Sequence, residues 1–120
     1  MRETWRPVEL DGKRWPYYVS NQGRVMNRRN RILKPWKRGQ RKGTYLCVRL
    51  CKKRVEVRID VHRLVALHFI ENPEDKPEVN HMDLDHYNNC VENLEWCTRI
   101  ENMQHRYFMR AHLELEAVAV

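Results

Sequence analysis

Residues 45–70 constrain the fold most, because two strand patterns, a turn and a helical pattern follow one another there. Apolar and polar side chains alternate over Tyr45–Leu50 and again over Val55–Ile59, as they do in half-buried strands. The basic segment 51–54 joins them, so we expect a β-hairpin. Asp60 then stands where a helix cap is favoured, and Asn72-Pro73 ends the helix. The apolar face that this helix would bury comprises Val61, Leu64, Val65, Leu67, Phe69 and Ile70.

The residues before this hairpin show short strand patterns separated by turns. Tyr17–Ser20 and Arg24–Met26 are expected to be strands, with a turn at Asn21–Gly23 between them. The segment 34–43 is polar and basic, which predicts a loop.

After the helix, the expected order is strand, loop, strand, helix. Val79–Met82 and Leu94–Cys97 are short strand patterns on either side of the polar loop 83–93. Thr98 and Glu101 have the spacing of a capping box, which predicts a helix from about Arg99 to about residue 115. These elements predict an α+β fold with a basic β-rich module at residues 1–58, a second unit at 59–115 and a tail at 116–120.

Charge is divided unevenly between the two halves of the chain. Residues 1–60 contain 18 Lys and Arg against 5 Asp and Glu, whereas residues 61–120 contain 5 against 11. Residues 24–54 contain 13 basic residues and no acidic one, which favours a nucleic-acid partner over a merely solvated basic surface. Expected DNA contacts are Arg24, Arg28, Arg29, Arg31, Lys34, Lys37, Arg38, Arg41 and Lys42, with Arg99 and Arg106 from the last helix.

Cysteine spacing argues against structural zinc. Cys47 and Cys51 are separated by three residues, and Cys90 and Cys97 by six, whereas zinc knuckles use two. The chain also has no apolar run of membrane-spanning length and no signal-peptide pattern at its start. We therefore expect a soluble, intracellular protein without disulfides.

Residues able to hydrolyse a phosphodiester gather in the second half of the chain. His81 leaves one expected strand and Asn93 enters the next, so a hairpin would bring the two together. Asn102 and His105 are three residues apart and share a helix face. Imidazole suits a general base near neutral pH, and oxygen ligands suit Mg²⁺. These residue types together predict metal-assisted hydrolysis.

The order of these residues resembles the HNH endonucleases, also called ββα-metal or His-Me finger nucleases. Val61-His62-Arg63-Leu64-Val65-Ala66, then Asn72-Pro73 and Val79-Asn80-His81, is similar to the lead-in to their motif. Asn93-Leu94-Glu95-Trp96-Cys97-Thr98 followed by Glu101-Asn102 is similar to its second half. Trp5-Arg6-Pro7-Val8 with residues 18–25 resembles a module found ahead of HNH domains in phage and homing endonucleases. The resemblance covers about residues 5–106 and implies a protein of the cytoplasm of a bacterium or a phage-infected host cell.

The resemblance implies a role for each matching residue. His81 would be the general base, and Asn93 would orient it and fix the loop. Asn80 and Asn102 would hold a divalent ion, Mg²⁺ or Mn²⁺. His105 would be a further ligand or a phosphate contact. Position 80 holds asparagine where some family members have aspartate, so the ligand set carries less charge.

Other polar residues are interpreted as structural. Asp83 and Asp85 are expected to shape a turn, and Asn88 and Asn89 the loop. His62, His68 and Trp96 are expected to have structural roles.

Three classes of function stay open. The first is a metal-dependent endonuclease that nicks or cuts double-stranded DNA, from a mobile element or as a phage packaging or recombination accessory. The second is a DNA-binding module of the same fold with impaired catalysis, which the neutral Asn80 motivates. The third is a zinc protein.

Overall fold

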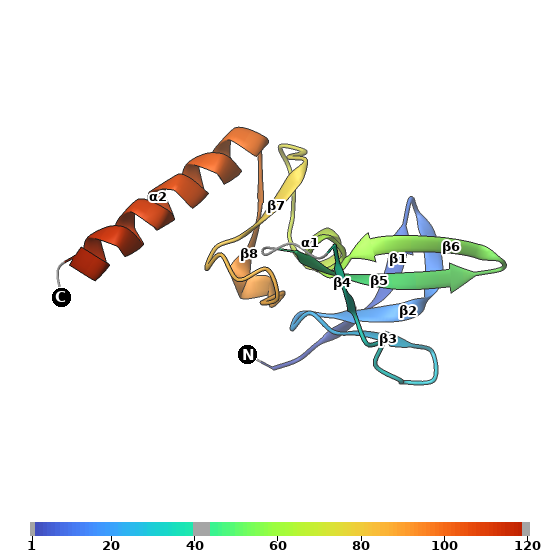
Figure 1. Cartoon of the computed structure of the whole chain (residues 1–120). Helices are drawn as coiled ribbons and strands as arrows, with labels where there is room; N and C mark the ends of the chain where they lie inside the picture. Colours follow the sequence, from blue (N-terminus) through green and yellow to red (C-terminus); the bar gives the residue numbers. More distant parts are fainter. Residues whose placement is uncertain (1, 40–43, 119–120) are drawn as a thin grey trace.

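The computed structural model describes residues 2–39 and 44–118, and within them three antiparallel sheets and two α-helices form an α+β fold (Figure 1). The first sheet contains β1 (Trp5–Leu10), β2 (Lys13–Ser20) and β3 (Val25–Asn27). The second contains β4 (Trp36–Arg38), β5 (Tyr45–Lys52) and β6 (Val55–Asp60). The third pairs β7 (Glu78–His81) with β8 (Leu94–Cys97). The helices are α1 (Val61–Phe69) and α2 (Arg99–Val118), with a short 3₁₀ turn, η1 (Val91–Asn93).

The first sheet is larger than the strand patterns indicated. β2 includes the expected strand Tyr17–Ser20, β3 is displaced by one residue from the expected Arg24–Met26, and β1 is an additional edge strand. A two-residue turn joins β1 to β2, and both Asp11 and Gly12 have positive φ, 52° and 73°. Such a turn matches the twist of a hairpin, and Asp-Gly is its favoured sequence. Val8 and Val19 on the inner face are fully buried.

The second sheet confirms the hairpin and corrects the expected loop. β5 and β6 pair in register, with Leu50 opposite Val57. Within the segment 34–43, β4 is a strand, and its Trp36 pairs with Cys47. The prediction of a loop was therefore wrong for β4, because a three-residue strand is too short to show a period of two.

Helix α1 joins the three sheets into one core. Its buried Leu64, Val65 and Ala66 belong to a cluster that also contains side chains of the three sheets: Val8, Val19, Val25, Val48, Leu50, Val79 and Leu94. This cluster spans both of the units expected from the sequence, and the boundary at residue 58 falls inside β6.

Two details of the expected helix 61–70 were wrong. Leu67 was expected in the core but is 51% exposed. Asp60 occupies the cap position, but its carboxylate accepts two hydrogen bonds from the Arg38 guanidinium, at 2.9 and 3.0 Å, and caps no helix N–H. Arg38 on β4 competes with the N–H groups of the helix for the Asp60 carboxylate. Arg38 prevails because a hydrogen bond between two charged groups is stronger than one to a neutral backbone N–H.

The last helix begins where the capping box predicted. The Thr98 N–H donates to Glu101 Oε1 at 2.9 Å, and the Glu101 N–H donates to Thr98 Oγ1 at 3.1 Å. Helix α2 continues to Val118, past the expected end, so residues 116–118 of the expected tail are helical. Figure 1 shows α2 leaving the body of the molecule after its first turns. None of the helices in the described part of the chain is both long and apolar enough to cross a membrane.

Candidate active site

His81 lies at the end of β7, in the middle of the contacts that hold the loop 82–93. Its side chain is 3% exposed, and its Nε2 lies 2.7 Å from Oδ1 of Asn89, which is itself buried. An amide oxygen only accepts, so Nε2 carries the hydrogen and Nδ1 retains the lone pair. Burial lowers the pKa of His81 below its ordinary value, and the hydrogen bond to Asn89 opposes part of that shift. The result is a neutral imidazole with one nitrogen able to take a proton.

Asn93 fixes the loop without touching the imidazole. Its Oδ1 accepts the Asp83 N–H at 2.9 Å, and its Nδ2 donates to Asp83 Oδ1 at 2.8 Å and to the Asn88 oxygen at 2.9 Å. The resemblance assigned the orientation of His81 to Asn93, whereas in this structure Asn89 makes that contact. Asn88 and Asn89 are adjacent residues of the same type, so the sequence does not show which of them reaches His81. The folded loop directs Asn89 to His81 and Asn88 to Asp83.

Asp83 and Asp85 shape the loop, as expected. Asp83 Oδ1 accepts the Asp85 N–H at 2.8 Å, and Asp85 Oδ1 accepts the Tyr87 N–H at 3.0 Å. These are the backbone bonds of Asx turns, and they hold the loop compact beside His81.

Asn80, His81 and Asn102 line one small pocket. Its volume is about 10 Å³, which is room for about one water molecule. Asn80 donates through Nδ2 to Glu95 at 2.9 Å, and Asn102 donates through Nδ2 to Glu78 at 3.0 Å. Each carboxylate therefore fixes the amide group, and Oδ1 remains the atom able to bind a cation. The other lining residues are Tyr45, Val79, Leu84, His86 and Arg106.

This donor set fits a hard divalent ion held partly by its substrate. Amide oxygens are ligands for Mg²⁺, which commonly takes one or two protein ligands and completes its shell with water and phosphate oxygens. No group of three or more His, Cys, Asp or Glu able to hold a metal occurs among the described residues. If an ion binds in this pocket, Asn80 and Asn102 would supply its amide-oxygen ligands and the phosphate of a substrate would supply negative charge.

His105 lies outside this pocket. Its Nε2 is 2.9 Å from the Met82 backbone oxygen, so the ring donates to the loop that follows His81. This bond ties α2 to the loop and occupies one of the two nitrogens that could bind a metal or a phosphate.

A cluster of rings surrounds the imidazole. The ring of Tyr45 stacks between those of His62 and His86, with centroids 4.8 and 4.4 Å away. The ring centroids of His62 and His81 are 4.9 Å apart, and Nδ1 of His62 is buried with no hydrogen-bond partner among the residues that the structure describes. Burial, followed by the charges of His81 and Arg63, lowers the pKa of His62 to about 3, so it stays neutral. The sequence indicated a structural role for His62 and counted Tyr45 only among the aromatics interleaved with the basic residues. It did not place Tyr45 or His86 beside His81, because Tyr45 is distant along the chain and His86 lies in the polar loop.

Comparisons with known proteins identify relatives of this chain. The NUMOD4 motif matches residues 3–51. Two uncharacterised HNH endonucleases of Acanthamoeba polyphaga mimivirus are each 41% identical over 86% of this chain, which covers 31% and 26% of their length. The DNA endonuclease I-HmuI of Bacillus phage SP01 is 33% identical over 85% of this chain and 56% of its own. A solved structure that concerns DNA binding and cleavage by the HNH homing endonuclease I-HmuI matches with a TM-score of 0.75 and 32% identity, covering 88% of this chain and 59% of that one.

This chain is homologous to the HNH endonucleases. The resemblance and the α+β fold expected from the sequence are thereby confirmed. The chain spans less than two thirds of the length of these relatives.

Several basic residues of this chain line one hollow of about 820 Å³, which lies between the first sheet and the tip of the β5–β6 hairpin. Its lining combines basic residues with Trp15, Tyr17 and Tyr18, a combination suited to a phosphate backbone and base faces. The basic residues are Arg14, Arg28, Arg29, Lys52 and Lys53, of which only Arg28 and Arg29 were expected DNA contacts.

The remaining expected DNA contacts differ in their surroundings. Arg24 pairs with Glu3, and Arg38 pairs with Asp60, so both are partly neutralised. Lys37 lies over the Tyr87 ring at 5.1 Å, and Arg106 lines the His81 pocket. Arg31, Lys34 and Arg99 are exposed. Arg41 and Lys42 lie outside the described residues.

Proposed function

We propose that this chain hydrolyses phosphodiester bonds in double-stranded DNA with one divalent ion, Mg²⁺ or Mn²⁺. The single observation that carries the proposal is the pocket shared by His81, Asn80 and Asn102. It joins a neutral base to two oxygen ligands in a space the size of one water molecule. The homologue I-HmuI is a DNA endonuclease that binds and cleaves DNA, which supports DNA as the substrate of this chain.

Each residue has one task in this mechanism. His81 takes a proton from the attacking water at Nδ1, because Nε2 is engaged by Asn89. Asn80 and Asn102 hold the ion, which supplies positive charge for the phosphate and the leaving 3′ oxygen. Arg106, at the rim of the same pocket, adds a cation for the phosphate oxygens. His105 is proposed to position the loop and not to bind the ion, because it donates to Met82.

A plasmid assay tests the proposal directly. Supercoiled and linear DNA are incubated with the chain in Mg²⁺, in Mn²⁺ and in EDTA, and nicked and linear products are separated on a gel. We expect cleavage that requires the ion and that is abolished in His81→Ala. Cleavage that persists in EDTA, or in His81→Ala, contradicts the proposal.

A second candidate is a DNA-binding module that has lost catalysis. The neutral Asn80 favours it, because two amide ligands attract a divalent ion less than an amide and a carboxylate do. Salt-sensitive DNA binding without cleavage in any divalent ion would support this candidate.

We do not propose a structural zinc site. Burial, then the charges of Glu78 and Glu95, raises the pKa of the Cys97 thiol to about 11, and burial raises the pKa of Cys47. Zinc binds the thiolate, which is disfavoured at both positions. Metal analysis of the purified chain tests this, since one bound zinc per chain would contradict it.

A further inference from the structure

The turn between β2 and β3 packs directly against the residue that holds His81. Gly23 in this turn has a φ of +82°, and a Cβ added to it would lie 2.8 Å from Cβ of Asn89 and 2.9 Å from its backbone oxygen. Real Cβ atoms do not come this close to other atoms, and backbone cannot swing away as a flexible side chain can. The bare backbone of Gly23 is therefore what permits the observed position of Asn89.

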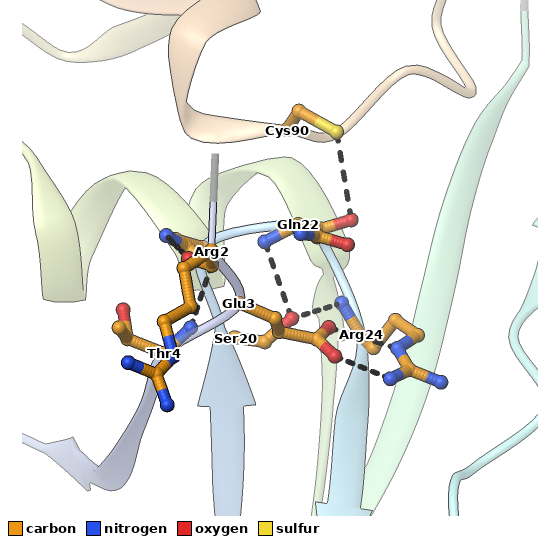
Figure 2. Close-up of polar contacts among 8 residues, drawn as sticks. Arg2, Glu3, Thr4, Ser20, Gln22, Arg24 and Cys90 are labelled. Atoms are coloured by element: carbon orange, nitrogen blue, oxygen red, sulfur yellow. Dashed lines mark hydrogen bonds and ion pairs between the residues drawn. The ribbon is translucent and has the colours of Figure 1, made fainter.

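Hydrogen bonds extend this contact along both segments. The Val91 N–H donates to the Asn21 oxygen at 2.8 Å. Cys90 Sγ donates to the Gln22 oxygen at 3.8 Å, a contact drawn in Figure 2. Residues 21–23 thus contact residues 89–91 through packing and two hydrogen bonds.

The turn is itself held rigidly by the start of the chain (Figure 2). Asn21 is 6% exposed, and its Oδ1 accepts the Thr4 N–H at 3.0 Å while its Nδ2 donates to the Arg2 oxygen at 3.1 Å. The fully buried Ser20 accepts the Gln22 N–H through Oγ at 3.2 Å. A turn fixed by so many backbone bonds can act as a rigid support for the loop that rests on it.

We propose that the Asn21–Gly23 turn is a positioning element of the active site: it fixes the backbone at Asn89, and Asn89 fixes the ring and tautomer of His81. The N-terminal module then influences the rate of cleavage as well as the binding of DNA. The catalytic consequence rests on the proposed function, whereas the orientation of the ring does not. The physical reason is that the path of contacts is short, because the turn packs on Asn89 and a single 2.7 Å hydrogen bond joins Asn89 to the imidazole.

Two glycines of the same module give a matched test. Gly12 has a φ of +73° and nothing within 4 Å of an added Cβ, so Gly12→Ala imposes the backbone cost alone. Gly23→Ala imposes a similar backbone cost and also pushes Asn89. Three quantities are measured on both full-length variants: the cleavage rate at saturating DNA, the DNA affinity, and the ¹⁵N and ¹³C shifts of the His81 imidazole, assigned with His81→Ala.

We expect Gly23→Ala to move the His81 ring shifts and to lower kcat by on the order of tenfold to a hundredfold, with DNA affinity unchanged. Gly12→Ala should lower Tm but leave kcat and the ring shifts as in the wild type. Equal kcat and equal His81 shifts in the two variants would overturn the proposal. If the wild type cleaves no DNA, the proposed function fails, and the ring shifts alone decide the positioning role.

A second variant covers the case in which Gly23→Ala does not fold. Val91→Pro removes the N–H that donates to Asn21, and the local backbone accepts it, because Cys90 is extended at φ −66° and ψ 140° and proline suits a first helical position. Val91→Ala keeps the N–H and is the control. We expect a loss of kcat and moved His81 shifts in Val91→Pro only, and equal behaviour of the two variants would overturn the proposal.

Discussion

The Nε2–H of His81 donates a 2.7 Å hydrogen bond to Oδ1 of Asn89, and both side chains are almost fully buried. This bond selects the tautomer that leaves Nδ1 free to accept a proton. It also makes Asn89, which the resemblance did not single out, the immediate partner of the base.

Removing this partner should slow cleavage more than it harms folding. Asn89→Ala leaves the ring free to rotate, and we expect a fall in rate of roughly tenfold to a hundredfold, as for other residues that orient an active imidazole. Asn88→Ala is the control, because Asn88 donates to Asp83 and not to His81. The measurement is the nicking rate at saturating DNA and Mg²⁺, and equal rates for the two variants would contradict the assignment.

The cleavage rate should depend on pH through an acidic limb. Because burial lowers the pKa of His81 below the ordinary 6.5, the base is already deprotonated at neutral pH. The rate should rise with pH, reach half its maximum below pH 6.5 and be flat above pH 7 if no other group titrates. A pH–rate profile at saturating ion checks this, and a midpoint above pH 6.5 would disagree with the burial of the ring.

Stability should fall in acid through His62. Its pKa is lowered from 6.5 to about 3 in the folded state, so between these pH values the unfolded chain binds a proton that the folded chain does not. Above pH 6.5 His62 is neutral in both states and does not change the free energy of unfolding with pH. As the pH falls from 6.5 toward 3, the free energy of unfolding decreases by up to roughly 1.4 kcal/mol per pH unit. His62→Phe keeps a ring in the stack with Tyr45 and should flatten this loss in urea unfolding series.

A control for that series lies on the exposed part of α2. His112→Gln should leave the acid-dependent loss of unfolding free energy as in the wild type, because His112 is exposed. If His62→Phe shows the same pH dependence as His112→Gln, another group is responsible for the loss.

A carboxylate at position 80 should strengthen binding of the ion. Asn80→Asp alone would face Glu95, which now accepts from the amide at 2.9 Å, so the two charges would repel. Combining it with Glu95→Gln restores a donor and an acceptor at this contact. We expect the double variant to need less Mg²⁺ for half-maximal cleavage than the wild type, with Glu95→Gln alone as the control. An unchanged Mg²⁺ requirement would place the ion elsewhere.

The capping box should matter to stability and to the position of Asn102. Thr98→Ala removes the side-chain bond to the Glu101 N–H and should lower the free energy of unfolding by about 1 kcal/mol. The Asn102 N–H bonds the Thr98 oxygen at 3.0 Å, so loosening this first turn should also slow cleavage. Ile100→Ala, on the same turn but 68% exposed, should change neither quantity, as urea unfolding and nicking assays can show.

The sequence by itself determined the parts that depend on local physics. Alternation over residues 45–59 gave the β5–β6 hairpin, and the spacing of Thr98 and Glu101 gave the start of α2, because strand period and helix capping are properties of neighbouring residues. The order of His81 and Asn102 likewise identified residues that share a pocket.

Only the tertiary structure decided which distant residues meet. Asp60 bonds Arg38 instead of capping α1, and Asn89 rather than Asn93 reaches His81. The Gly23 turn rests on Asn89 although 65 residues separate them along the chain. Such contacts depend on how the sheets pack around α1, and packing between elements leaves no periodic trace along the chain.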